Sequence, residues 1–245
     1  MKFYSSIAPF YDDIFPLSPA QLAVVQSILR PGDRVLDVGC ASGSLALALA
    51  KQGYPVLGID LDSNLIALAN ERASGTPDCP AVFEKANMLQ VGTHYPGTPS
   101  GLVVTVGNTL VHLSRAEIKT YLHGVHDHLS PGGRFLIQTI NYDRVIKDKI
   151  AALPTIDNDK IMFVRKYDLS QLPNSLLFQT SLTIKESGET IENTIPLTPL
   201  LAEELGSMLA ETGFSISTRY GNFKQEPYDE NSYALIVVAD KNLKP

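Results

Sequence analysis

Short apolar runs rich in β-branched residues alternate along the first 140 residues with longer stretches whose apolar positions recur every three or four residues. The short runs are typical of strands buried in a parallel sheet, and the longer stretches are typical of helices that cover it. The pattern therefore predicts an α/β fold with helices on both faces of the sheet. The expected strands are 34–39, 55–60, 81–87, 101–107 and 133–140, and the expected helices are about 18–30, 43–52, 63–73 and 114–129.

This alternation stops after residue 140. Residues 141–197 contain two strand-like stretches, 161–169 and 176–197, with polar interruptions and no helix between them. Glu186-Ser187-Gly188-Glu189 is typical of a hairpin turn. We therefore expect residues 141–197 to form a small antiparallel β cap inserted into the α/β domain.

The α/β pattern returns after the insertion. A helix is predicted to begin at Thr198-Pro199 and to end at Gly213, and strands are predicted over 214–220 and 233–240. Residues 1–140 and 198–245 are thus expected to fold together as one domain.

Composition narrows the class of protein. Of the 245 residues, 44% are hydrophobic and 19% are charged, and the formal net charge is −6. Nucleic acid is not an expected partner, because binding to its phosphates relies on clustered Lys and Arg. No apolar run reaches the length of a membrane-spanning helix, and the first residues lack the apolar stretch of a signal peptide. Cys40 and Cys79 are too few for a disulfide framework or a zinc site. We expect a soluble, cytoplasmic protein that does not bind membranes.

The strongest chemical signal is the stretch VLDVGCASGS at residues 35–44, where a strand runs into a small-residue loop that opens a helix. Gly39 and Gly43 allow a ligand to approach the backbone closely, and the helix N-terminus offers free N–H groups to an anionic group. Asp60 ends the second strand, seventeen residues after Gly43. A carboxylate at that place can accept both hydroxyls of a ribose.

Two classes of cofactor use this layout. Dinucleotide-binding enzymes require G-x-G-x-x-G, and the corresponding residues Gly39, Ala41 and Ser44 match it poorly. The same stretch resembles the acid-x-G-x-G-x-G motif of class I S-adenosylmethionine-dependent methyltransferases, with Asp37 as the acid and Gly43 as the last glycine. Ala41 departs from the usual central glycine of that motif.

Later residues extend this resemblance. Asp60-Leu61 resembles the second motif of the family, in which the acid holds the ribose and the apolar residue packs on the adenine. Asn87-Met88 resembles the third motif, although most relatives have Asp in place of Asn87. The resemblance implies a Rossmann-like seven-stranded, mostly parallel sheet with an antiparallel last strand. It also implies S-adenosylmethionine as cofactor and S-adenosylhomocysteine as product. The implied cofactor-binding residues are Tyr11, Asp37, Gly39, Cys40, Ala41, Gly43, Asp60, Leu61, Asn87, Met88, Gly107 and Asn108.

The loop after the fourth strand, residues 107–113 (GNTLVHL), faces the transferable methyl group in this family. It lacks the N-P-P-Y sequence of enzymes that methylate adenine or glutamine amides. It resembles the loop of small-molecule methyltransferases, among them glycine N-methyltransferase-like enzymes. His112 is a candidate base near the acceptor, and the alternative is a histidine that supports the loop at a helix start.

Two further segments are expected near the substrates. Tyr4 and Tyr11-Asp12 resemble an N-terminal segment that folds over the cofactor in relatives, and the alternative is that these aromatic residues only anchor a helix. Arg165 on a cap strand could clamp a carboxylate or phosphate of the substrate, and the alternative is a solvent-exposed cap residue. The candidate substrate-side residues are Tyr4, His112, Asn141, Tyr142, Arg165 and Tyr167, of which His112 and Tyr142 are the catalytic candidates.

The predicted reaction is in-line methyl transfer to a small-molecule acceptor, for which the main task of the protein is alignment. Two alternatives stay open: a pseudoenzyme or regulator that binds S-adenosylmethionine, and an NAD(P)-dependent oxidoreductase. No metal site is expected, because His123, His126, Asp127 and His128 are predicted on a solvent-exposed helix face. The acceptor, its reacting atom and the oligomeric state, for which a homodimer is one option, are not readable from the sequence.

Overall fold

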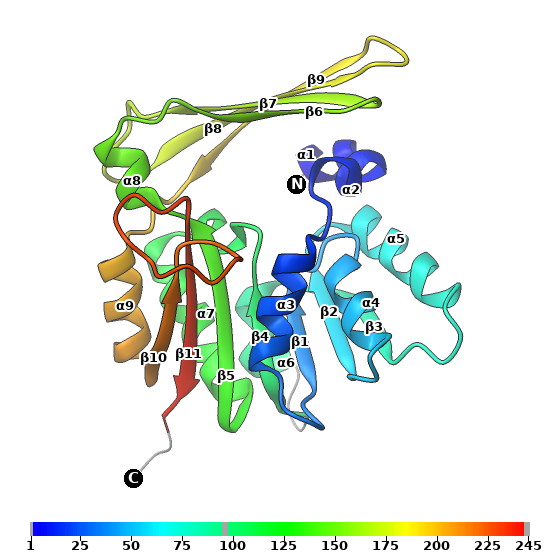
Figure 1. The fold of residues 1–245 in the computed structure, drawn as a ribbon, viewed down its shortest axis with the longest axis vertical. Helices are drawn as coiled ribbons and strands as arrows, with labels where there is room; N and C mark the ends of the chain where they lie inside the picture. Colours follow the sequence, from blue (N-terminus) through cyan, green and yellow to red (C-terminus); the bar gives the residue numbers. More distant parts are fainter. Residues whose placement is uncertain (1, 95–97, 243–245) are drawn as a thin grey trace.

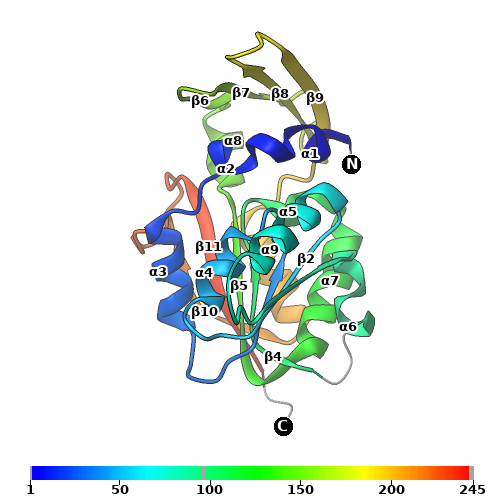
Figure 2. The same cartoon turned by 90° about the vertical axis from the view of Figure 1, so that its right-hand side faces the viewer.

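The computed structural model describes residues 2–94 and 98–242, and Figures 1 and 2 show its ribbon from two sides. The main sheet contains β1 (Val35–Val38), β2 (Val56–Asp60), β3 (Ala81–Lys85), β4 (Ser100–Thr105), β5 (Leu129–Ile140), β10 (Phe214–Tyr220) and β11 (Ala234–Lys241). Its strand order is β10-β11-β5-β4-β1-β2-β3. Strands β1 to β5 pair in parallel, and β11 runs antiparallel to β5 and β10. The predicted Rossmann-like sheet with an antiparallel last strand is confirmed.

Helices cover both faces of this sheet (Figures 1 and 2). The helices of the α/β part are α3 (Pro19–Ile28), α4 (Ser44–Ala50), α5 (Ser63–Ser74), α6 (Val91–His94), α7 (Arg115–His128) and α9 (Ala202–Glu211). Buried side chains of α3, α4 and α5 form one apolar cluster with the sheet, and those of α6, α7 and α9 form another on the opposite face. The sheet thus has a core on each side, as its continuous apolar strands require.

A second sheet lies above the carboxyl ends of the central strands (Figure 1). It is antiparallel, in the order β6 (Ala152–Asp157), β7 (Ile161–Asp168), β8 (Leu176–Ile184) and β9 (Thr190–Leu197). We call it the cap sheet. The pattern predicted β7, β8 and β9, but it missed β6 and the helix α8 (Tyr142–Lys147) that leads into the cap. Tyr142 and Val145 of α8 are buried in the core of the main domain.

The N-terminal residues form a layer between the cap sheet and the main domain (Figures 1 and 2). They comprise α1 (Lys2–Ile7), a 3-10 turn η1 (Ala8–Phe10) and α2 (Tyr11–Ile14). Ile7 and Ile14 are buried in one cluster with Phe163 and Leu182 of the cap sheet. We call residues 2–14 the N-terminal segment.

Two local predictions are wrong. Helix α9 begins at Ala202 rather than at Thr198-Pro199, because the backbone N–H of Thr198 donates to the carbonyl of Val111 in an extended segment. The histidines of α7 are not all on a solvent-exposed face. His128 is only 6% exposed and its Nε2 lies 2.9 Å from Ser100 Oγ, and the ring of His126 packs on Phe214.

Among the described residues, no helix is long and apolar enough to cross a membrane. The same residues contain no group of three His, Cys, Asp or Glu side chains that could hold a metal ion.

Candidate active site

The loop between β1 and α4 is shaped by residues in left-handed backbone conformations. Gly39 has φ +76° and Gly43 has φ +80°. A methyl group added at Gly39 would lie 2.7 Å from Thr109 Cγ2, and one added at Gly43 would lie 2.7 Å from the ring of Phe83. Both positions therefore require glycine on steric as well as conformational grounds. The missing side chains let Thr109 and Phe83 pack directly on the backbone of the loop at the carboxyl end of β1.

Asp60 connects this loop to the second strand. Its Oδ2 accepts a hydrogen bond from Ala41 N at 3.0 Å, and its Oδ1 accepts one from Asp62 N at 2.9 Å. Burial raises the pKa of Asp60, and these backbone N–H groups act against that rise. Each oxygen retains acceptor capacity, so the fixed carboxylate can accept further hydroxyl groups.

Asp37 is the second buried acid of the site. It is 2% exposed, and within the described part of the chain no hydrogen bond reaches its carboxylate. Burial, with the nearby charge of Asp60, raises the pKa of Asp37 to about 7. Asp37 also lines a cavity, so a cationic ligand group could reach it there. A buried carboxyl with such a raised pKa is typical of a functional site.

Two adjoining cavities form a crevice at the carboxyl ends of the central strands, which is where open α/β sheets bind ligands. Both are bordered by Tyr4, Tyr11, Gly39, Ala41 and Gly107. The first is also lined by Val38, Ile59, Asp60, Leu61, Asp62, Leu65, Ala86, Asn87, Met88, Thr109, His112 and Leu113. The second also reaches Asp12, Asp37, Cys40, Ser42, Ser44 and Gln138.

Most of the predicted cofactor residues meet in this crevice. Leu61, 45% exposed, offers an apolar surface beside Asp60. Asn87 accepts from Leu89 N at 3.0 Å, which leaves its amide nitrogen available. Asn108 borders neither of the two cavities, because its side chain bonds to Tyr142 and to the backbone of Ile140.

The N-terminal segment is attached to the glycine loop through Asp12. Its Oδ1 accepts hydrogen bonds from Ser42 Oγ at 2.6 Å and Ser44 Oγ at 2.9 Å, and its Oδ2 pairs with Arg72 of α5. Burial alone would raise the pKa of Asp12, but the contacts with Arg72, Ser42 and Ser44 lower it. The carboxylate is therefore a charged link that places Tyr4 and Tyr11 over the crevice.

Comparisons with known proteins agree with this geometry. The family described as "Methyltransferase domain" matches residues 35–133. A putative methyltransferase of Geobacillus sp. (strain WCH70) is 28% identical over 254 residues, covering 97% of this chain and 99% of that protein. These findings confirm the predicted class I S-adenosylmethionine-dependent methyltransferase.

Solved structures share the whole fold of this methyltransferase. The CcbJ methyltransferase from Streptomyces caelestis has a TM-score of 0.83 at 21% identity, covering 97% of this chain and 96% of that one. An S-adenosylmethionine-dependent methyltransferase from Clostridium acetobutylicum ATCC 824 has a TM-score of 0.79 at 12% identity, covering 98% and 100%.

S-adenosylmethionine is the cofactor of this methyltransferase, and the residues present fit it. One cavity offers the carboxylate of Asp60, which can accept hydroxyl groups, beside the apolar side chains of Leu61 and Met88. The uncompensated carboxylate of Asp37 suits a ligand that carries a sulfonium and an ammonium group. The enzyme and cofactor predictions are thus confirmed, and the oxidoreductase alternative is not supported.

Tyr4 and His112 form a polar pair on the wall of the first cavity. The Tyr4 hydroxyl lies 3.1 Å from His112 Nε2, and the two rings meet edge to face at 5.8 Å. Burial lowers the pKa of His112 to about 4 and raises that of Tyr4. Both groups are therefore uncharged near neutral pH, and the pair can donate and accept hydrogen bonds toward an acceptor.

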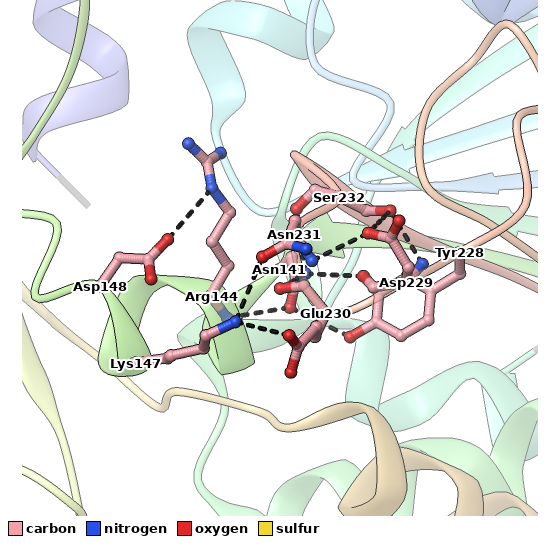
Figure 3. Close-up of polar contacts among 9 residues, drawn as sticks. All are labelled: Asn141, Arg144, Lys147, Asp148, Tyr228, Asp229, Glu230, Asn231 and Ser232. Atoms are coloured by element: carbon pink, nitrogen blue, oxygen red, sulfur yellow. Dashed lines mark hydrogen bonds and ion pairs between the residues drawn. The ribbon is translucent and has the colours of Figure 1, made fainter.

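The structure gives Asn141 and Tyr142 contacts within the protein. Asn141 is 1% exposed, and its Nδ2 donates to the carbonyl of Ser232 at 2.9 Å while its Oδ1 accepts from the Tyr228 hydroxyl at 3.1 Å (Figure 3). It thereby holds the loop 228–232 against α8. Tyr142 is fully buried and accepts from Asn108 Nδ2 at 3.0 Å. Neither residue borders the two cavities of the crevice.

The cap contributes Arg165 and Tyr167 from β7. Tyr167 is 5% exposed and packs on Tyr142 and Phe178. Arg165 is partly buried, its Nη2 donates to the carbonyl of Pro154 at 2.7 Å, and its guanidinium lies 5.9 Å from the centre of the Phe163 ring. Both side chains belong to the face of the cap sheet that is turned toward the main domain.

Sequence reasoning missed several residues that line the crevice, and three of them fix its shape. Thr109 fills the space above Gly39, Gln138 Oε1 accepts from Gly107 N at 2.7 Å, and Asp12 links the N-terminal segment to the glycine loop. Asp12 stands beside Tyr11 in a segment already singled out, so the signal was present but was assigned to its neighbour. Thr109 and Gln138 carry no local signal, because their partners are distant in sequence.

Proposed function

We propose that this enzyme methylates a small molecule that binds between the crevice and the cap sheet. The observation that carries the proposal is that the N-terminal segment encloses the crevice. This segment contacts Phe163 of the cap sheet on one side and the glycine loop on the other. An enclosed crevice admits a small molecule more readily than a nucleic acid or a folded protein. The net charge of −6 also disfavours nucleic acid.

Known relatives support a small-molecule acceptor. A structural neighbour with a TM-score of 0.65 is CalS10, an amino pentose methyltransferase from Micromonospora echinaspora. Phosphoethanolamine N-methyltransferase 1 of Arabidopsis thaliana is 30% identical over 209 residues, but the chain covers only 38% of that protein. Both act on small molecules, as their names state.

In the proposed arrangement, Asp60 binds the ribose hydroxyls of S-adenosylmethionine, and Leu61 and Met88 lie against the adenine. Asp37 faces the cationic methionine part, where its negative charge stabilises the bound cofactor. Tyr11 and the glycine loop enclose the cofactor. When bound, the cofactor supplies a methyl group already activated by a positive sulfur.

The chain's own residues then have two tasks. The N-terminal segment and the cap exclude water and align the acceptor, and alignment can lower the barrier by several kcal/mol. The Tyr4–His112 pair orients the acceptor, with neutral His112 accepting a hydrogen bond from it. Residues 141–197 form the substrate-side subdomain in this proposal.

Release of S-adenosylhomocysteine tests the proposal. We expect isothermal calorimetry to detect S-adenosylmethionine binding, and product release to occur with members of a panel of small amines, amino sugars and hydroxylated compounds. Tyr4→Phe should leave cofactor affinity unchanged and lower kcat about tenfold or more. Transfer only to tRNA or protein would refute the small-molecule acceptor. Tight binding with no transfer to any acceptor would favour a pseudoenzyme.

A further inference from the structure

The inner face of the cap sheet has one polar row between two apolar rows. Thr180 of β8 lies directly opposite Arg165 of β7 and Asn193 of β9 in the antiparallel register. The next row on one side of it is apolar and consists of Phe163, Leu182 and Ile191. The next row on the other side of it consists of two aromatic residues and one aliphatic residue: Tyr167, Phe178 and Ile195.

The flanking rows fix the direction in which this face points. Phe163 is buried against Ile7 and Ile14 of the N-terminal segment, and Tyr167 packs on Tyr142 of the main domain. Because alternate residues of a strand share a face, Arg165 lies on that face between these two contacts. We call Arg165, Thr180 and Asn193 the polar row.

Each member of the polar row has a buried polar atom without a hydrogen-bond partner. Within the described residues six buried side-chain polar atoms lack a partner, and three of them are Arg165 Nε, Thr180 Oγ1 and Asn193 Nδ2. Thr180 is 5% exposed. Leaving a buried donor unpaired costs free energy, and three unpaired groups in one cross-strand row are costly unless a ligand satisfies them.

The charge of the row is also uncompensated. In the described part of the chain, no carboxylate lies within ion-pair distance of Arg165, and its Nη2 donates to the neutral carbonyl of Pro154. Burial lowers the pKa of Arg165, as expected for a cation removed from water without a counter-ion. All three unpaired groups can act as donors.

We propose that the polar row binds an oxyanion of the methyl acceptor, a carboxylate or a phosphate, and thereby selects acidic acceptors. Three neighbouring donors, one of which belongs to a guanidinium, match the oxygens of such a group better than they match a neutral or cationic one. None of the three residues borders the two cavities of the crevice, so in this proposal the anion binds under the inner face of the cap sheet and the reacting part of the acceptor extends from there into the crevice. This inference rests on the proposed small-molecule acceptor, whose class it defines.

The test measures anion binding to the protein saturated with S-adenosylhomocysteine, using sodium phosphate and sodium acetate as probes in calorimetric titrations at constant ionic strength. We expect at least one probe to bind with millimolar affinity, and the stronger probe identifies the group as phosphate or carboxylate. Arg165→Gln should weaken this binding about tenfold or more. Lys166→Gln is the matched control, because Lys166 is exposed on the outer face of the same strand, and it should change affinity less than twofold.

A second variant separates binding from folding. Thr180→Val keeps the shape of the side chain, so it should weaken anion binding and raise Tm by about 2 °C, since an unpaired buried hydroxyl is removed. Absence of binding to both probes, or equal effects of Arg165→Gln and Lys166→Gln, would overturn the proposal. Both variants should bind S-adenosylhomocysteine normally, so a loss of that binding would instead count against the proposed architecture of the crevice.

Discussion

Asp37 gives the sharpest prediction, because its buried carboxyl opposes folding when it is ionised. Its pKa rises from 3.8 in the unfolded chain to about 7 in the folded protein. Well below pH 3.8 the group is protonated in both states. As the pH rises toward 7, the unfolded chain releases the proton first, so the folded state binds more protons and loses stability. At about 1.4 kcal/mol per pH unit, the loss amounts to about 4 kcal/mol above pH 7.

Asp37→Asn removes this titration. The cofactor-free variant is expected to be more stable than wild type by about 4 kcal/mol at pH 8, and the difference should disappear near pH 4. Urea unfolding at pH 4, 6 and 8 measures both free energies of unfolding. Glu186→Gln, at an exposed carboxylate of the β8–β9 turn, is the control for the change in net charge.

The affinity for the cofactor should change with pH in the direction opposite to the stability of the cofactor-free protein. The ionised carboxylate attracts a cationic ligand, so wild-type affinity for S-adenosylmethionine is expected to increase between pH 6 and pH 8, while the affinity of Asp37→Asn stays low and flat. If wild type and Asp37→Asn have parallel stability curves across this range, the raised pKa of Asp37 is refuted.

Three further variants test the crevice. Asp60→Ala should weaken S-adenosylmethionine binding about tenfold to a hundredfold in calorimetry, because a buried ligand hydroxyl loses its charged acceptor; unchanged affinity would contradict the proposed ribose site. Gly39→Ala should lower the free energy of unfolding by about 2–4 kcal/mol, since strain at φ +76° adds to the clash with Thr109. The matched variant Gly53→Ala, at φ +87° with open space, should cost about 1 kcal/mol, and equal losses would exclude the clash. Asp12→Asn should increase hydrogen exchange in the N-terminal segment and weaken cofactor binding. The control Asp13→Asn, which loses only its bond to the exposed Lys160, should do neither. Equal hydrogen exchange in the two variants would refute the link through Asp12.

The inner strands of the main sheet, such as β1 and β4, were predictable because they are buried on both faces and therefore read as continuous apolar runs. Strand β6 was not predictable, because Leu153 and Ile156 are only partly buried on an edge of the cap sheet and stand among polar residues. The start of α9 was also hidden. Its first N–H, at Ala202, is capped by Asp143 Oδ2 at 2.9 Å. That cap comes from 59 positions earlier in the chain, beyond any local pattern.

The same distinction applies to the site. Gly39, Gly43 and Asp60 act through local geometry, so their spacing along the chain revealed them. The polar row became visible only when strand register placed Thr180 and Asn193 beside Arg165. Asp12 stood in a segment that the sequence had already singled out, but its role as a link appeared only when the fold brought it to Arg72.

The position of the N-terminal segment has a practical consequence for handling the protein. Helix α1 starts beneath the cap sheet, whereas β11 carries the chain to the opposite end of the molecule (Figure 1). Any affinity tag, reporter or surface tether joined ahead of α1 would therefore stand next to the layer that encloses the reactants. The same attachment placed after β11 would point away from them, so immobilisation from that end is the geometry in which turnover can be measured without obstruction.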